Sequence, residues 1–318
     1  VDSRKRVQRT TLPGTTMSLT RRAFISASAT AAVASTLPST SVSAAPITRS
    51  GKSQLRVGLA AYSMRQYLTA KPGTKGAMDL LGFIDWAATL GVDAVELTSY
   101  FFPATFDRAY LNEVKRRCHI NGLDISGGAI RNNYTLPDGD PELEKWLAHT
   151  DTWLGHYAVL GAPVVRVFSG VPPKGMSEEQ GIANGIKNLR KALVFAEKHG
   201  VILGLENHDY LTKIDRMLPA LAQIDSPWFG VNLDSGNVDD TDVYPQLAKI
   251  VPYAVNVQLK VDTGPVKQKV PTDVPRFVKL LKDANYRGYV VLEYESAPDP
   301  YEAIPGHLAA LRDAIAKA

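Results

Sequence analysis

From Arg56 onward, short apolar runs alternate with longer segments of helical periodicity, at a spacing of roughly 25 to 40 residues, which suits repeated strand–helix units. Strands are expected at 56–61, 92–97, 123–129, 163–168, 201–206, 228–233, 254–259 and 289–293. Helices are expected at about 77–90, 106–120, 142–160, 177–199, 211–224, 244–250, 274–284 and 302–316. Strict alternation of this number of strands and helices predicts an α/β fold, the (β/α)8 TIM barrel.

A doubly wound open sheet is the alternative fold for such a pattern. That fold usually has fewer strands and carries a glycine-rich phosphate-binding turn after its first strand. Here the first strand leads into Ala61-Tyr62-Ser63-Met64-Arg65, which contains no glycine. No break in composition follows residue 55, so residues 46–318 are expected to form a single barrel domain and residues 1–45 an N-terminal extension.

The extension has the features of an export signal. Arg21 and Arg22 lie in the segment TRRAFI, which resembles the twin-arginine signal, and a weakly apolar stretch leads from there to a cleavage site at Ala44 and Ala45. The apolar stretch is too short and too polar to stay in a bilayer. We therefore expect residues 1–45 to be disordered or cleaved and the mature protein to be exported to the periplasm without stable membrane insertion; a plain disordered tail is the alternative.

The net charge of +4 belongs to this extension and not to the predicted barrel. Residues 1–45 hold six Lys or Arg and one Asp, a net of +5, so the remaining chain carries −1. A barrel without a basic surface field is not expected to bind nucleic acid. Cys118 is the only cysteine, which excludes an intrachain disulfide and a zinc site made of thiolates.

Polar side chains follow the last four predicted strands where each apolar run stops. These side chains are Glu206, Asp234, Gln258 and Glu293. The carboxyl ends of barrel strands open on one face, so the four are expected to converge. Three carboxylates at such short distances repel one another, and a bound divalent cation usually offsets this repulsion. Oxygen ligands favour Mn²⁺, with Mg²⁺ or Co²⁺ also suitable. The alternative is that these acids cap helices or pair with arginines.

The segments LGLENHD, VNLDSGN, NVQLKVD and YVVLEYE resemble strands five to eight of the xylose-isomerase-like TIM barrels, the sugar phosphate isomerase/epimerase superfamily. GVDAVELTSY and LGAPVVRVFSG are similar to the second and fourth strands of that superfamily. The resemblance implies that Glu206, Asp234, Gln258 and Glu293 bind one divalent metal ion. It also implies that Glu206 and Glu293 are the catalytic pair. Gln258 stands where a histidine ligand is common, and Asn237 stands where many relatives place a sugar-binding histidine.

Other polar residues near the strand ends are candidates for binding the substrate. The set is His208, Lys260, Asn237, Arg166, Asn133 and Glu96. Lys260 shares the inward parity of Gln258 and is expected to neutralise an oxyanion or the carboxylates. Arg166 and Glu96 are expected either to form a salt bridge inside the barrel or to contact the substrate. Tyr62 and Tyr100 offer rings for stacking or packing.

The resemblance, together with the acids at the strand ends, implies a metal-dependent isomerase or epimerase of a sugar or keto sugar. The metal polarises a carbonyl, and a carboxylate then exchanges the acidified proton next to it. Loss of a β-leaving group after the same first step makes a lyase, or an enzyme that cleaves 3-keto glycosides, the first alternative. A carbohydrate-binding barrel without catalysis is the second, although binding alone does not require paired acids. The sequence leaves homo-oligomerisation open.

Overall fold

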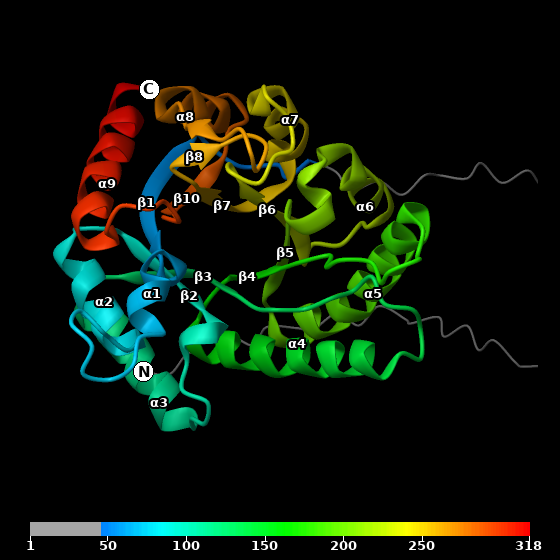
Figure 1. The fold of residues 1–318 in the computed structure, drawn as a ribbon, viewed down its shortest axis with the longest axis horizontal. Helices are drawn as coiled ribbons and strands as arrows, with labels where there is room; N and C mark the ends of the chain where they lie inside the picture. The colour runs from blue at the N-terminus through cyan, green and yellow to red at the C-terminus, as the bar shows by residue number, and fades with distance from the viewer. Residues whose placement is uncertain (1–45) are drawn as a thin grey trace, which may run out of the picture. The chain divides into compact units, whose positions relative to one another are not determined.

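The computed structural model describes residues 46–318, so the predicted export signal lies outside the described residues. The main strands are parallel and close into a barrel in the order β1, β10, β7, β6, β5, β4, β3 and β2, with helices around the outside (Figure 1). Because neighbouring strands of the barrel follow one another in the sequence and helices connect them, the predicted single-domain TIM barrel is confirmed.

The strand bounds agree with the predicted ones to within two residues. The barrel strands are β1 (Gln54–Ala60), β2 (Ala94–Thr98), β3 (Asp124–Ala129), β4 (Val164–Val167), β5 (Ile202–Glu206), β6 (Phe229–Asp234), β7 (Ala254–Leu259) and β10 (Arg287–Leu292). The outer helices are α2 (Leu80–Thr89), α3 (Arg108–Ile120), α4 (Pro141–Leu160), α5 (Glu178–His199), α6 (Leu218–Gln223), α7 (Val243–Ile250), α8 (Val274–Asp283) and α9 (Pro300–Lys317). The agreement follows from the near-continuous apolar runs of strands that are buried on both faces.

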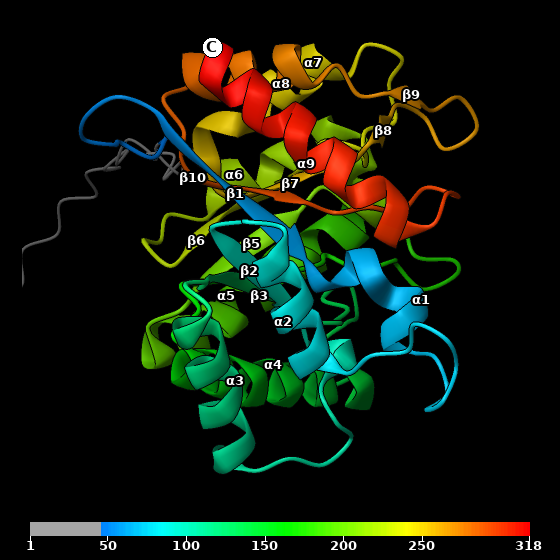
Figure 2. The same ribbon diagram turned by 90° about the vertical axis from the view of Figure 1, so that its left-hand side faces the viewer.

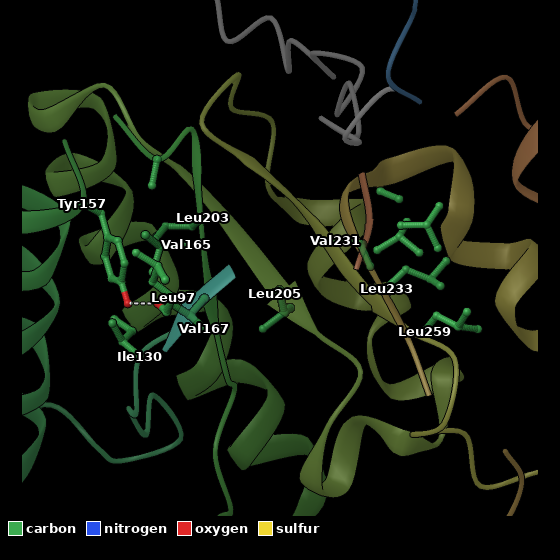
Figure 3. Packing of buried hydrophobic residues seen from close by; sticks show 14 of the residues in the cluster. Leu97, Ile130, Tyr157, Val165, Val167, Leu203, Leu205, Val231, Leu233 and Leu259 are labelled. Atoms are coloured by element: carbon green, nitrogen blue, oxygen red, sulfur yellow. Dashed lines mark hydrogen bonds between the residues drawn. The ribbon is translucent and has the colours of Figure 1, made fainter. Parts of the chain in front are cut away.

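Side chains of the helices fill the space between the helical layer and the barrel. Tyr157 of α4 reaches the strands and donates a hydrogen bond of 2.5 Å to the carbonyl of Leu97 (Figure 3). A Cβ atom at Gly128 of β3 would lie 2.1 Å from this ring. Only glycine at this position therefore leaves room for the ring against the strand, and the contact holds α4 against the side of the barrel that carries β2 and β3.

Most of the longer helices begin at a side-chain cap, which explains why their starts are sharp. The capping residues are Asp79, Asp107, Asp140, Ser177, Asp273 and Asp299, and each accepts a hydrogen bond from a backbone amide in the first turn of its helix. The predicted start of α5 at the Ser177 cap is confirmed. No helix among the described residues is long and apolar enough to cross a membrane.

The predicted helix at 211–224 is wrong over its first half. Two 3-10 turns, η3 (Asp209–Thr212) and η4 (Ile214–Arg216), occupy that half, and α6 starts only at Leu218, where Pro219 fits the first turn. Other short elements were not predicted either. The short helix α1 (Arg65–Leu68) follows β1, and β8 (Asp262–Thr263) pairs with β9 (Val270–Pro271) after β7; both lie at the end of the barrel where the strands terminate (Figure 2).

Candidate active site

A cavity of about 370 Å³ is formed by residues at the carboxyl ends of the barrel strands. Almost every strand contributes to it, and the contributing residues include Tyr62 after β1, Tyr100 after β2, Arg131 after β3, Arg166 of β4, Glu206 of β5, Lys260 after β7 and Glu293 after β10. Of the four side chains expected to converge, Glu206 and Glu293 line this cavity, whereas Asp234 and Gln258 do not. Its charged groups are arranged around two buried cations, Lys260 and Arg166.

Lys260 is the centre of the first group. Its Nζ atom lies 2.8 Å from Oε2 of Glu293 and 3.4 Å from Oδ2 of Asp234, and it also contacts the carboxylate of Glu295. Lys260, Asp234 and Glu293 are all buried, whereas Glu295 is partly exposed at the cavity. We call these four residues the mouth cluster.

The mouth cluster keeps its lysine charged. Burial alone would lower the pKa of Lys260, but the carboxylates of Asp234, Glu293 and Glu295 outweigh it and raise that pKa well above its ordinary value. Burial raises the pKa of Glu293 and of Asp234, and the ammonium group partly opposes both shifts. Burial also acts to raise the pKa of Glu295, yet the adjacent Lys260 lowers it overall. The cluster is therefore held together by one fixed positive charge.

Arg166 is the centre of the second group. Its Nε atom lies 2.9 Å from Oε2 of Glu206, and its Nη1 atom donates a hydrogen bond of 2.9 Å to the carbonyl of Ile130. Asn237 also contacts this glutamate, because its Nδ2 atom donates a hydrogen bond of 3.0 Å to Oε1 of Glu206. The ion pair of Arg166 is with Glu206, so the salt bridge considered between Arg166 and Glu96 is not formed. Asn237 does not line the cavity, so it acts on the site through its hydrogen bond to Glu206, which orients that glutamate.

Glu96 and Gln258 lie beneath the cavity in a separate polar layer. Oε1 of Gln258 accepts a hydrogen bond of 2.6 Å from Asn232, and its Nε2 atom donates to Oε1 of Glu96 at 2.7 Å. Asn256 donates to Oε2 of Glu96 and to Oδ1 of Asn232, both at 2.7 Å. Burial, followed by the nearby Glu293, raises the pKa of Glu96 to about 7. We call these four residues the closed layer, since their hydrogen bonds run among themselves and none of them lines the cavity.

His208 and Asn133, two of the residues expected to bind the substrate, line the cavity. The ring of His208 packs against that of Phe168 at an interplanar angle of 37°, with centroids 4.4 Å apart, and its Nδ1 atom lies 3.0 Å from Asp209. Burial lowers the pKa of His208, but Asp209 and Glu206 raise it to a greater extent. Asn133 donates a hydrogen bond of 3.0 Å from its amide to the carbonyl of Val171, which holds the loop after β3 at the rim.

Arg131 and Glu295 line the cavity and were not among the predicted site residues. Glu295 shares the strand parity of Glu293, so alternation along the strand was a usable signal for it. Arg131 lies in a loop, where no periodicity indicates the direction of a side chain. Its guanidinium group lies 4.7 Å from the ring centroid of Tyr100, which brings a third positive charge to the cavity.

The four predicted metal ligands do not form a metal-binding set in this arrangement. The amide oxygen of Gln258 accepts a hydrogen bond from Asn232, and the Lys260 ammonium contacts Asp234 and Glu293. Oδ1 of Asp234 accepts two backbone hydrogen bonds, of 2.7 and 3.0 Å. Its Oδ2 atom has no hydrogen-bond partner among the described residues and lies 3.4 Å from Nζ of Lys260. In residues 46–318, no three His, Cys, Asp or Glu side chains come together in a way that could hold a metal ion. The residues present therefore do not fit the expected ion.

Fold and cavity together define a (β/α)8 barrel with a polar site at its strand ends. Residues 84–314 match the xylose isomerase-like TIM barrel family. The chain belongs to this family, which confirms the resemblance seen in the strand-end segments. No curated protein matches the sequence significantly.

Solved structures with the same fold include several of known activity. A 3-keto-D-glucoside 4-epimerase from E. coli has a TM-score of 0.64 and 16% identity, over 82% of this chain and 100% of that one. A D-psicose 3-epimerase from Clostridium cellulolyticum has a TM-score of 0.61 and 18% identity, over 81% and 90%. The IolI protein, solved with a zinc atom, has a TM-score of 0.64 and 13% identity, over 82% and 98%. At such identities the likeness establishes a common fold.

Proposed function

We propose that the protein is an isomerase or epimerase that moves a proton next to the carbonyl of a sugar or keto sugar. The observation that carries this proposal is that Glu206 and Glu293 line one cavity, each beside a buried cation. A carboxylate held by such a partner has a fixed orientation, which general acid–base catalysis requires. The names of the two epimerases described above support keto sugars as the substrate class.

The chemistry follows from the charges around the cavity. One glutamate takes the proton from the carbon next to the carbonyl, and the electron pair of that C–H bond moves to the carbonyl oxygen. The ammonium of Lys260 and the guanidinium of Arg166 offset the negative charge that develops there. Return of a proton to the opposite face of the same carbon inverts it. Protonation of the former carbonyl carbon, with transfer of the neighbouring hydroxyl proton to the former carbonyl oxygen, moves the carbonyl instead. Tyr62 and Tyr100 present rings to the sugar.

The predicted Mn²⁺, Mg²⁺ or Co²⁺ ion has no part in this proposal, because the residues expected to bind it are engaged with one another. Export by the twin-arginine route is a separate proposal that concerns residues 1–45. Replacing Arg21 and Arg22 with lysine should keep the protein in the cytoplasm, and N-terminal sequencing of exported protein should place the cleavage close to Ala44. Normal export of the double variant would refute this route.

Deuterium exchange tests the proposed chemistry. A panel of keto sugars is incubated with the protein in D₂O, and uptake at carbon is followed by NMR. Wild type and Glu144→Gln, a surface control on α4, should exchange one substrate, whereas Glu206→Gln and Glu293→Gln should not. Loss of a leaving group from the labelled product would indicate a lyase. Tight binding of a sugar without exchange would favour a carbohydrate-binding protein and refute the proposal.

A further inference from the structure

We infer that the ammonium group of Lys260 takes the place of a divalent cation at the centre of this site, so that the site works without a metal ion. Lys260 then acts as the electrophilic group toward the substrate oxygen. The location of the lysine is an observation about the chain itself. Its chemical role rests on the proposed function, and the experiments below separate the two.

The location of the ammonium group is the first step. Nζ of Lys260 lies 2.8 Å from Glu293 and 3.4 Å from Asp234, two of the carboxylates expected to bind a metal. Glu295 contacts the same nitrogen from the cavity side. A cation in contact with three carboxylates offsets their mutual repulsion, as a divalent ion would otherwise do.

The path of the side chain shows that the surroundings are shaped for a lysine. A Cβ atom at Gly236 would lie 2.5 Å from Cγ and 2.6 Å from Cβ of Lys260, so the absence of a side chain at 236 makes room for the stem. The backbone amide of Lys260 donates a hydrogen bond of 2.8 Å to the hydroxyl of Ser235, which fixes the start of that stem. Lys260 is only 7% exposed. It is a packed part of the site and not a surface lysine that has folded inward.

The remaining expected ligands cannot form a second metal site nearby. Gln258 is bonded within the closed layer through both its amide oxygen and its amide nitrogen. Glu206 faces Arg166 at 2.9 Å and Asn237 at 3.0 Å. An added divalent ion would also be repelled at short range by Lys260, an interaction that is strong away from bulk water. Both geometry and charge therefore oppose a metal ion.

The chemical step balances with these groups alone. The C–H bond next to the carbonyl breaks, its proton goes to a glutamate, and its electron pair forms the enediolate. The enediolate oxygen accepts a hydrogen bond from the Lys260 ammonium, which keeps its proton throughout. The glutamate pair then returns a proton to carbon, and no oxidant, reductant or further reactant is needed.

The first test measures the metal content and metal response of the wild-type protein. We expect elemental analysis of the purified protein to give far less than one equivalent of any transition metal. We also expect its melting temperature to be unchanged by EDTA and by added Mn²⁺. A stoichiometric metal, with a melting temperature that falls on chelation, would overturn the inference. These readouts do not depend on any substrate.

The second test removes the lysine. Lys260→Ala leaves Asp234 and Glu293 without their cation and opens the space that the stem filled. We expect this variant to bind Mn²⁺ at least about 100-fold more tightly than wild type, because a unit charge next to the ion no longer opposes it. Titration calorimetry and the rise in melting temperature with Mn²⁺ measure the change. Lys249→Ala, which removes an exposed lysine paired with Asp215, is the matched control.

The outcomes separate the inference from the proposed function. If no keto sugar exchanges deuterium, the proposed function fails, yet metal content and Mn²⁺ binding still decide whether Lys260 replaces a metal. If exchange occurs and EDTA abolishes it, the inference fails while the proposed function stands. Lys260→Ala that folds and binds Mn²⁺ no better than wild type also counts against the inference, and if that variant does not fold, the wild-type measurements decide.

Discussion

The barrel interior holds two polar groups, the closed layer and the mouth cluster, which lie one above the other. Both accommodate buried carboxylates, but they compensate the charge of these carboxylates in different ways. The closed layer holds one acid, Glu96, among three amide side chains, and two of these amides, Asn256 and Gln258, each donate a hydrogen bond to one of its oxygens. The mouth cluster holds three acids around one ammonium group and borders the cavity. The closed layer has no side open to the cavity, whereas the mouth cluster has one side open to a ligand.

This difference indicates which group is structural and which is chemical. Hydrogen bonds that saturate a buried network stabilise one arrangement of the strands and leave nothing to react. Charges beside a cavity keep interaction capacity for a bound molecule, and such charges are typical of reactive sites. Changes in the closed layer should therefore reduce stability, and changes at the mouth should reduce activity or metal exclusion.

Loss of an acid at the mouth gives the largest expected effect. Glu293→Gln keeps the shape of the side chain but removes the carboxylate that exchanges the proton. We expect deuterium exchange to fall by about 10² to 10⁴, the usual contribution of a general acid or base. NMR exchange rates with saturating substrate measure it, with Glu144→Gln as the surface control. Full activity in Glu293→Gln would break the assignment of chemistry to the mouth cluster.

The lysine of the mouth cluster is expected to matter for stability as well. Lys260→Met removes the charge but keeps the length of the stem, so Asp234 and Glu293 lose their buried partner. We expect about 3 to 5 kcal/mol of destabilisation at pH 8, the usual cost of breaking a buried ion pair from one side. Urea unfolding measures it. Lys249→Met should change stability by less than about 1 kcal/mol, as for other exposed pairs, and an equal effect of both would contradict the cluster.

The sequence predicted the barrel well because each strand is an apolar run that is buried on both faces. The prediction failed where the pattern of apolar and polar residues was mixed. In the stretch before α6, turns replace the expected helix up to Leu218. The hairpin of β8 and β9 was also missed, since two-residue strands carry no periodicity. Local pattern therefore identifies the elements that the core needs and leaves out the loops that shape the mouth.

For the site, alternation along a strand predicted the face of a side chain but not its depth. Gln258 and Lys260 share one face of the β7 segment, yet two residues along a strand separate their levels by about 6 to 7 Å. That distance places Gln258 in the closed layer and Lys260 at the cavity. Whether Arg166 pairs with Glu206 or with Glu96 likewise depends on three-dimensional distances between strands, which one sequence does not contain.

Glu96 gives the next largest effect, through pH. Its pKa rises from an ordinary 4.5 to about 7 in the folded protein, so between these values the folded state binds more protons than the unfolded state. Stability must then fall as pH rises through this window, by on the order of 3 kcal/mol in total. Urea unfolding from pH 5 to pH 8 should show this slope in wild type and a smaller one in Glu96→Gln. Equal slopes would show that Glu96 is not the titrating acid of the closed layer.

The smallest effect that we predict separates the two groups most directly. Asn256→Ala removes the amide that donates to Glu96 and to Asn232, and it leaves both acceptors buried without that partner. We expect a loss of about 1 to 3 kcal/mol in unfolding free energy, which is the cost of unsatisfied buried polar groups. Deuterium exchange by the folded variant should stay at the wild-type rate, because no residue of the closed layer lines the cavity. Asn112→Ala, at an exposed position on α3, is the control. A variant that stays stable but loses exchange would place the closed layer in the chemistry and remove the distinction between the two groups.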